Sequence, residues 1–302
     1  MSLTTSIHSP KGAVFNGSKT ILAHTPNSTI LDLQYYSVPQ LKPNHRPLEL
    51  VFVRHGESEG NVAVKAAEDG DPSLFTDEFR KRHSSTWDLT PKGVEQAKAA
   101  GKWIRENING GVFDGYYAST YRRAKRTAGF LNLPGAKWNL RDYIREHDWG
   151  NLDVMTDEER HTKYPDAMDK REVNPFYFAA PGGESLAEVL IRARVGILAT
   201  LYRKLPNKRG VVVTHGNMMW PIRIIMEGLL PDEYLALKKK KDPKDKINNC
   251  QIFQYSRINP ETGEISEKFS WMRSVCPWNL NPKNDAWRPI THKKYSNEEL
   301  IK

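Results

Sequence analysis

The chain has 302 residues, of which 27% are charged and 38% belong to the hydrophobic set, and its net charge is +9. This composition is typical of a globular protein, and no run approaches the roughly 18 apolar residues of a transmembrane helix, so we expect no membrane span. Cys250 and Cys276 are too few for a disulfide framework and lack a metal-binding spacing, so we interpret them as reduced structural thiols. The positive charge favours an anionic partner, either nucleic acid or a phosphorylated small molecule.

The predicted elements begin with a leader. Residues 1–31 contain several serines and threonines but no acidic residue, a composition that overlaps with organelle transit peptides. They lack arginine, a clear amphipathic stripe and the apolar core of a secretory signal. We therefore favour a flexible leader on a cytoplasmic protein and leave organelle targeting open. The expected organisation is a leader at 1–46, a main domain at 47–276 with insertions near 57–87 and 150–180, and a polar C-terminal tail at 277–302.

Short apolar runs predict buried strands in the main domain. The first, at 48–53, runs directly into Arg54-His55-Gly56, and another, at 210–214, runs into His215-Gly216. Thr90 followed by a proline predicts the start of a helix. The other predicted elements are a strand at 113–118, helices starting near Arg122, covering 185–204 and ending near Ile225, and a hairpin of 251–255 with 268–272.

Strands that alternate with helices predict an α/β fold, a three-layer sandwich in which helices flank a mostly parallel central sheet. In such sheets, reactive groups collect at the carboxyl ends of the strands. Arg54 and His55 follow one predicted strand and His215 follows another. We therefore expect these side chains to be neighbours in space although they are far apart in the sequence.

The densest basic run is Lys238–Lys241, which continues into alternating acids and lysines around a proline. This pattern favours a solvated loop over a surface that reads a groove. No motif of a known nucleic-acid reader, with interleaved aromatic and basic residues, is present, so we expect no nucleic acid partner. A phosphorylated small molecule is the favoured partner.

His55 is distinguished by its neighbours, because a histidine at a strand end is by itself more often structural than catalytic. Arg54 carries a planar fork of donors that matches the oxygens of a phosphoryl group. Gly56 would let the backbone approach an anion, and Asn61 would add a neutral donor. These residue types together favour phosphate chemistry at His55.

Residues 54–61 resemble the signature of the histidine phosphatase superfamily, the phosphoglycerate-mutase-like enzymes. They read Arg-His-Gly-Glu-Ser-Glu-Gly-Asn. Four later blocks resemble further segments of this family in the same order: Ser119–Ala128, Ile144–Gly150, Pro181–Ser185 and Thr214–Asn217. One such block is weak evidence, whereas five in the right order, over about residues 48–256, are specific.

The resemblance implies a phosphomonoester hydrolase in which His55 takes the phosphoryl group onto its imidazole ring. Glu146 would protonate the leaving oxygen and then activate the water that hydrolyses the phosphohistidine. A backbone carbonyl such as that of Gly56 could hold the ring in one tautomer, and neither a metal nor a cofactor is required. The implied catalytic residues are His55, Glu146, His215, Arg54 and Arg123, and the implied phosphate- or substrate-binding residues are Asn61, Gly216 and Asn217.

Two alternatives stay open, a phosphoglycerate-mutase-type phosphotransferase and a catalytically silent phosphate-binding module. The family's cofactor-dependent mutases carry Glu-Arg-His-Tyr-Gly at the acid and paired arginines beyond it. This chain has Glu-His-Asp-Trp-Gly from Glu146, a run that is closer to the family's broad-specificity phosphatases. Beyond it, the pair Lys170-Arg171 is no clear match to the paired arginines. The mutase-like segments His215–Asn217 and Met226–Gly228 keep the first alternative alive, while a silent module would have no need of Glu146.

Overall fold

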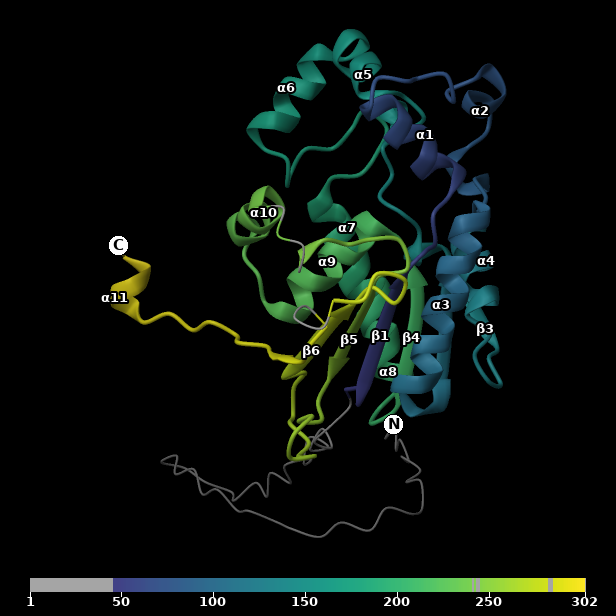
Figure 1. Cartoon of the computed structure of the whole chain (residues 1–302). Helices are drawn as coiled ribbons and strands as arrows, with labels where there is room; N and C mark the ends of the chain where they lie inside the picture. Colours follow the sequence, from purple (N-terminus) through teal and green to yellow (C-terminus); the bar gives the residue numbers. More distant parts are fainter. Residues whose placement is uncertain (1–45, 241, 243–244, 282–284, 302) are drawn as a thin grey trace, which may run out of the picture. The chain divides into compact units, whose positions relative to one another are not determined.

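A computed structural model describes residues 46–240, 242, 245–281 and 285–301. Within them, one seven-stranded sheet has the order β3-β2-β4-β1-β5-β6-β7. The strands β3, β2, β4 and β1 run parallel, and β5, β6 and β7 each run antiparallel to the strand before them in this order (Figure 1). The strands are β1 Glu49–Arg54, β2 Gly115–Ser119, β3 Trp138–Arg141, β4 Arg209–Thr214, β5 Ile252–Ser256, β6 Trp271–Val275 and β7 Arg288–Pro289. The predicted α/β class is confirmed.

Helices connect the parallel strands and extend beyond the sheet. The α-helices are α1 Glu59–Glu68, α2 Asp77–Lys81, α3 Pro91–Asn107, α4 Arg122–Leu131, α5 Asp157–Lys163, α6 Pro165–Val173, α7 Leu186–Arg192, α8 Ala199–Lys204, α9 Gly216–Glu227, α10 Pro231–Lys240 and α11 Asn297–Leu300. The 3₁₀ turns are η1 Ser84–Thr86, η2 Asn109–Gly111, η3 Asp142–Ile144 and η4 Gly150–Leu152, and η5 Ala193–Leu198 is a π-helical segment.

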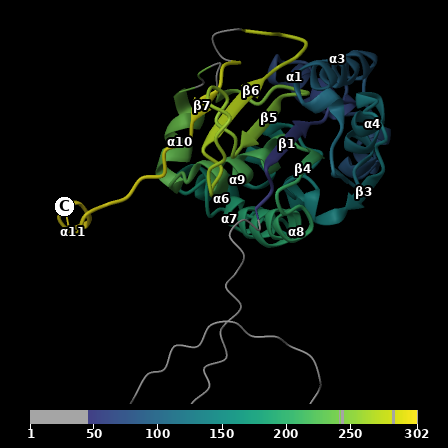
Figure 2. The same ribbon diagram turned by 90° about the horizontal axis from the view of Figure 1, so that it is seen from below.

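The sheet has two apolar faces because successive residues of a strand point to opposite sides. Leu50 and Phe52 of β1 join a core with α7, η5, α8 and α9, whereas Val51 and Val53 join a second core with α3 and α4. Figure 2 shows these two groups of helices on opposite sides of the sheet. The helices therefore cover both faces, which confirms the three-layer sandwich and explains why β1 reads as an unbroken apolar run.

Most predicted elements are confirmed to within one or two residues. Thr90 is the N-cap of α3, and its hydroxyl accepts from the Gly93 N–H at 3.0 Å. Strand β2 starts later than expected, because the Phe113 N–H donates to the Tyr116 hydroxyl at 2.9 Å instead of joining a strand ladder. The helix predicted over 185–204 forms as α7, η5 and α8, with the π-helical segment in its middle.

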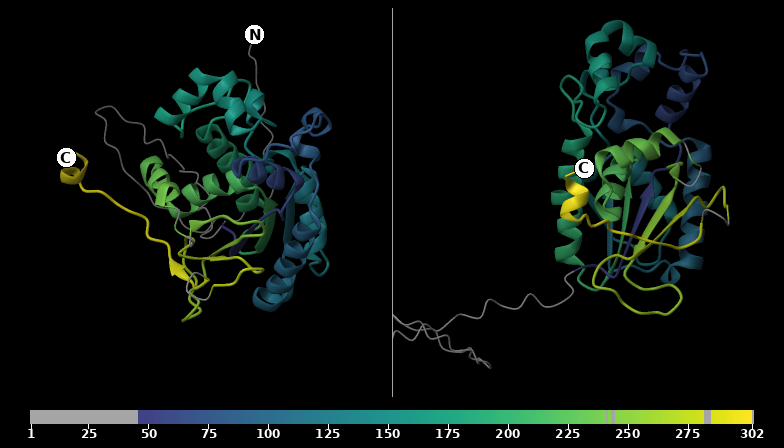
Figure 3. Two further views of the ribbon diagram at one scale, coloured as in Figure 1. Left: turned by 45° about the horizontal axis from the view of Figure 1, so that its top comes forward. Right: turned by 90° about the vertical axis from the view of Figure 1, so that its left-hand side faces the viewer.

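The carboxyl ends of β1 and β4 lie side by side, since Arg54 pairs with Thr214 in the parallel register and the His55 N–H donates to the Thr214 carbonyl at 2.9 Å. His55 and His215 therefore follow neighbouring strands at one edge of the sheet. Figures 1 and 3 show α1, α2, α5 and α6 beyond this edge. Arg80 links α2 to α5 and to the chain before it, because it donates to the Glu159 carboxylate of α5 at 2.9 Å and to the Val154 carbonyl at 3.2 Å.

The prediction of a solvated loop at the basic run is wrong for its first three lysines, which form the last turn of α10. Asp232 and Glu233 in the first turn and lysines in the last turn both suit the helix dipole, which the charge pattern alone did not reveal. The Lys238 ammonium also donates to the Tyr234 hydroxyl at 3.1 Å. Lys241 lies outside the described residues.

The predicted terminal segments are described only in part. Of the leader, residues 1–45 lie outside the described residues. In the predicted tail, β7 pairs antiparallel with β6, so the tail adds an edge strand to the sheet. Among the described residues, no helix combines the length and the apolar character needed to cross a bilayer. Cys250 and Cys276 are buried and unpaired, as expected.

Candidate active site

The ring of His55 is held in one tautomer at the end of β1. Its Nδ1 lies 2.7 Å from the Gly56 carbonyl, which can only accept, so Nδ1 carries the hydrogen. The Arg123 Nε–H donates to Nε2 at 3.1 Å, so Nε2 presents its lone pair. Burial, and after it the positive charges of Arg123 and Arg54, holds the pKa of His55 well below 6.5. The arrangement is that of a neutral imidazole with a nucleophilic nitrogen.

A glycine is required at position 56 for a different reason from the predicted approach of the backbone to an anion. A Cβ at this position would lie 2.3 Å from the Gly93 carbonyl oxygen at the start of α3, so a side chain would collide with backbone. The Gly56 N–H donates to the Thr127 hydroxyl at 3.0 Å and is therefore not free to bind an anion. Gly56 is required for the packing of the His55 loop against α3, and its carbonyl orients the imidazole, as predicted.

Two arginines flank His55. The Arg54 Nη1 donates to the Ile247 carbonyl at 2.8 Å, while its Nε has no hydrogen-bond partner within the described part of the chain. Arg123 is buried at the start of α4, and its Nη1 donates to the Ser84 carbonyl at 2.7 Å. Burial is the first cause of a lowered pKa for both guanidinium groups. Their remaining N–H donors suit the oxygens of a phosphoryl group.

His215 lies beside His55, with 5.1 Å between the two ring centroids. Its Nε2 is 2.8 Å from the Ser119 hydroxyl at the end of β2, and its buried Nδ1 has no partner among the residues that the structure describes. Burial, followed by the charge of Arg123, holds the pKa of His215 well below 6.5. A neutral ring with an unused nitrogen at this edge could donate to a phosphoryl oxygen.

Glu146 completes the group of residues around His55. One nitrogen of each histidine and one carboxylate oxygen of Glu146 lie within 4.8 Å of one another. By distance alone these three side chains could hold a metal ion, but the guanidinium groups of Arg54 and Arg123 make the surroundings positive and favour an anion instead. The carboxylate accepts from the His147 N–H at 3.0 Å, and the Asn217 N–H lies 3.5 Å from its other oxygen.

The three predicted binding residues differ in what they offer. Gly216 and Asn217 open helix α9, whose first N–H groups can bind an anion, although the Asn217 N–H also lies 3.5 Å from the Glu146 carboxylate. The amide oxygen of Asn61 accepts from the Ser58 N–H at 3.2 Å and from the Asn249 amide at 3.0 Å. Asn61 thus ties the start of α1 to residue 249, a contact between segments far apart in the sequence.

Several other residues lie close to these in the sequence or in space. His147, which follows Glu146, has its Nε2 2.6 Å from the Glu184 carbonyl. Met218, which follows Asn217, packs in the core. The bonds of Ser119 to His215 and of Asn249 to the His55 carbonyl, the latter at 3.2 Å, were not foreseen. Only the place of Ser119 at a strand end offered a signal.

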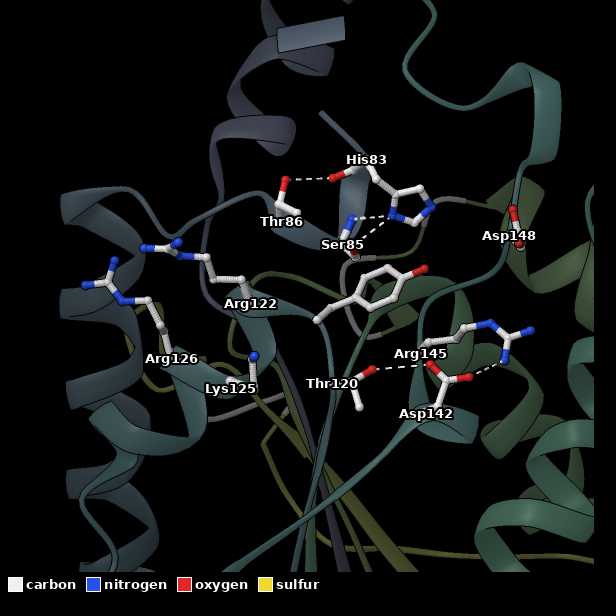
Figure 4. Close-up of a pocket in the computed structure, with 11 residues that line it drawn as sticks. His83, Ser85, Thr86, Thr120, Arg122, Lys125, Arg126, Asp142, Arg145 and Asp148 are labelled. Atoms are coloured by element: carbon white, nitrogen blue, oxygen red, sulfur yellow. Dashed lines mark hydrogen bonds and ion pairs between the residues drawn. The ribbon is translucent and has the colours of Figure 1, made fainter. Parts of the chain in front are cut away.

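A polar pocket of about 1000 Å³ lies next to His215 and Arg123, and Figure 4 shows the residues that line it. Tyr121, which lines it, also packs edge-on against the His215 ring at 5.2 Å and against the Arg123 guanidinium at 5.1 Å. Two of the cations that line the pocket are already paired, since Arg122 and Arg126 both form ion pairs with Asp88. The lining residues are His83, Ser85, Thr86, Thr120, Tyr121, Arg122, Lys125, Arg126, Asp142, Arg145 and Asp148.

The family model of the histidine phosphatase superfamily (branch 1) matches residues 50–241, which include both histidines and Glu146. The chain therefore belongs to the histidine phosphatase superfamily.

Relatives and solved structures give the same family and fold. A 2,3-bisphosphoglycerate-dependent phosphoglycerate mutase of Afipia carboxidovorans is 30% identical over 62% of this chain and 84% of the relative. One of Methylorubrum populi is 25% identical over 63% and 84%. Among solved structures, a mycobacterial glucosyl-3-phosphoglycerate phosphatase matches with a TM-score of 0.53 at 23% identity, covering 69% of this chain and 92% of that one. A protein described as mycobacterial hydrolase 1 matches with a TM-score of 0.54 at 21% identity over 82% and 99%.

Proposed function

We propose that the protein hydrolyses phosphomonoesters through a phosphohistidine on His55. The observation that carries this proposal is the state of the His55 ring, because Nδ1–H is bonded to the Gly56 carbonyl and the lone pair of Nε2 faces the Arg123 donor. A phosphoryl group bound here would draw the guanidinium hydrogens onto its oxygens and release that lone pair. Attack by an unprotonated, oriented imidazole next to cationic donors is the arrangement that phosphoryl transfer needs.

In the first step, Nε2 forms a bond to phosphorus while the bond to the ester oxygen breaks and that oxygen takes a proton from Glu146. In the second step, Glu146, now a carboxylate, takes a proton from water as the water oxygen attacks phosphorus and the bond to Nε2 breaks. The products are an alcohol and inorganic phosphate. Arg54, Arg123 and the Nδ1–H of His215 would hold the three non-bridging oxygens, on which the charge of a loose transition state is spread.

The second candidate is a mutase, and the names of relatives at 25–30% identity favour it. The residues near Glu146 favour hydrolysis instead. His147 stands where the family's mutases carry an arginine, and its Nε2 is bonded to the Glu184 carbonyl. Arg171, the candidate for the paired arginines, stacks on the Trp149 ring at 4.9 Å. Neither side chain lines the polar pocket.

The substrate that we propose is a phosphorylated small molecule with a polar leaving group. The pocket beside Tyr121 is lined mainly by residues with hydroxyl, carboxylate and cationic groups. Because Tyr121 of this pocket packs against His215 and Arg123, the leaving group would extend past Tyr121 into the pocket, where hydroxyl groups could replace the hydrogen bonds of water. We propose that the protein works in the cytoplasm. We also propose that it acts without a metal or a cofactor and has no nucleic acid partner.

The test is a rapid-quench experiment with a ³²P-labelled phosphomonoester. We expect an acid-labile, base-stable phosphoprotein in the wild type and its absence in His55→Ala. His161→Ala, which removes an exposed histidine of α5, is the control and should label normally. Label that persists in His55→Ala would overturn the proposal. Release of labelled inorganic phosphate supports the hydrolase, whereas return of the label to another position of the substrate supports the mutase.

A further inference from the structure

The main chain that carries Glu146 is held far more firmly than its carboxylate. Residues 143–148 begin in the last two residues of η3 and then continue as irregular chain toward η4. The Glu146 carboxylate itself accepts one close hydrogen bond, from the adjacent His147 N–H. Its position relative to His55 is therefore set by the backbone of this segment, and the question is what fixes that backbone.

One guanidinium group, that of Arg192 at the end of α7, binds most of the segment. It donates to three backbone carbonyls of the segment, those of Tyr143 at 3.1 Å, Arg145 at 3.0 Å and Glu146 at 3.3 Å. It also forms a two-point ion pair with the Glu184 carboxylate, at 2.8 Å and 2.6 Å. The Arg192 side chain is only 12% exposed, so this pair is largely shielded from water.

Glu184 holds the second half of the same segment. Its carboxylate accepts from the Arg145 guanidinium at 3.1 Å and from the Asp148 N–H at 3.2 Å. Its backbone carbonyl is 2.6 Å from the His147 ring, and its N–H donates to the Asp148 carbonyl at 2.9 Å. Arg192 and Glu184 together therefore contact every residue from 145 to 148 and Tyr143 before them.

Local helix geometry brings Arg192 to this place. Ser185 caps α7 through a capping box with Glu188, which fixes where the helix begins directly after Glu184. The π-helical segment η5 begins directly after Arg192, and its Gly196 lies against Tyr143, where an added Cβ would be 3.1 Å from the tyrosine side chain. The wider turn and the missing side chain let the helix approach the segment closely.

We infer that Arg192 and Glu184 form a clamp that positions Glu146 as the general acid. They are positioning residues, because neither is among the groups that meet around the His55 ring. The clamp leaves the carboxylate free to exchange its proton while fixing the carbonyl of the same residue. This inference rests on the proposed function, in which Glu146 protonates the leaving oxygen.

The test compares Arg192→Lys with wild type on an alkyl phosphate and on p-nitrophenyl phosphate. A lysine keeps the charge but cannot bind three carbonyls and a carboxylate at once. A misplaced acid should lower kcat/KM about ten- to a hundredfold for the alkyl ester, whose alkoxide leaves poorly unless it is protonated. The loss for p-nitrophenyl phosphate should be at most a few-fold, because its phenolate leaves without much protonation. Glu146→Gln should show the same pattern, and adding Arg192→Lys to it should change the ratio of the two rates no further.

Arg257→Lys is the control, since Arg257 is a buried arginine that also donates to backbone carbonyls, those of Ser266 and Arg46, at the other end of the sheet. It should lower both rates by the same small factor. Glu184→Gln serves as a second variant where Arg192→Lys fails to fold. Equal losses on both esters in the clamp variants, with Glu146→Gln still selective, would overturn the clamp alone. A Glu146→Gln variant that loses both activities equally would overturn the acid role and the clamp with it.

Discussion

Ser119→Ala should weaken catalysis by releasing the ring of His215 from one tautomer. The Ser119 hydroxyl accepts from the Tyr121 N–H at 3.2 Å and lies 2.8 Å from His215 Nε2. Of these two partners, only His215 Nε2 can accept the hydroxyl hydrogen, so we expect that hydrogen to point at Nε2. A neutral ring that accepts at Nε2 carries its own hydrogen at Nδ1, the nitrogen that has no partner among the described residues. Ser119 would thus turn His215 into a donor for a phosphoryl oxygen.

The size of the effect follows from these contacts. Removing an oriented donor to a developing negative charge costs about 10²–10³-fold in kcat. Ser119→Ala keeps the ring and only frees its tautomer, so the expected loss in kcat/KM is smaller, about tenfold. The fully buried Nε2 also loses its partner, which should cost about 1–3 kcal/mol of stability. For a domain of this size that lowers Tm by about 2–4 °C per kcal/mol.

The assay combines kcat/KM on p-nitrophenyl phosphate with ¹⁵N NMR of histidine-labelled protein, which reports the tautomer of each ring. Ser274→Ala is the control, because Ser274 is also buried and accepts from the Gln251 amide at 2.9 Å on a strand away from the site. It should lower Tm but leave kcat/KM within about twofold of wild type. A wild-type spectrum with the hydrogen of His215 on Nε2 would refute the reasoning, as would full activity in Ser119→Ala.

Three further predictions concern charge and space at the site. The pKa values of His55 and His215 are lowered in the folded state, so below pH 6.5 the unfolded chain binds more protons. Stability should therefore fall on acidification below this pH, by at most about 1.4 kcal/mol per pH unit for each histidine, and urea titrations of wild type and His55→Asn at pH 5 and 7 should show a smaller loss in the variant. Gly216→Ala places a Cβ 3.2 Å from the Arg54 Nε and should raise the inhibition constant for inorganic phosphate several-fold, whereas Gly129→Ala, which meets nothing within 4 Å, should not. Phosphate at 100 times its dissociation constant should stabilise the wild type by about 2.7 kcal/mol, measured as a shift in Tm, and Arg54→Met should largely lose that shift.

The positions of the reactive residues could be predicted because the signals are local. An apolar run that stops at Arg54 marks a strand end, and Thr214-His215 marks a second one. Parallel strands with helical connections must present such ends at one edge, so two segments about 160 residues apart could be placed together without any coordinates. In the structure, Arg54 pairs with Thr214, so the ends of β1 and β4 do lie side by side.

The supporting contacts could not be predicted, because their partners carry no distinctive sequence. Arg192 donates mainly to backbone carbonyls, and every residue has one. Gly56 suggested close approach to an anion, whereas the group that excludes a side chain there is the Gly93 carbonyl of α3. The amide of Asn61 was expected to face phosphate, yet its oxygen is taken up by Ser58 and by Asn249, a residue 188 positions away. Such contacts depend on how helices and loops pack, which periodicity and capping signals do not encode.

The charges at the site explain why the histidines are kept neutral. Burial lowers the pKa of Arg54 and Arg123, and the Glu146 carboxylate is the charge that most favours both cations. A proton on His55 would add a third positive charge and remove the nucleophilic lone pair at once. A phosphoryl dianion does the reverse, since it supplies the missing negative charge and acceptors for donors such as Arg54 Nε that have none within the described residues. A bound metal or proton would therefore add to the positive charge at the site, whereas a bound phosphate would offset it, which supports the proposed ligand and the proposed nucleophilic form of His55.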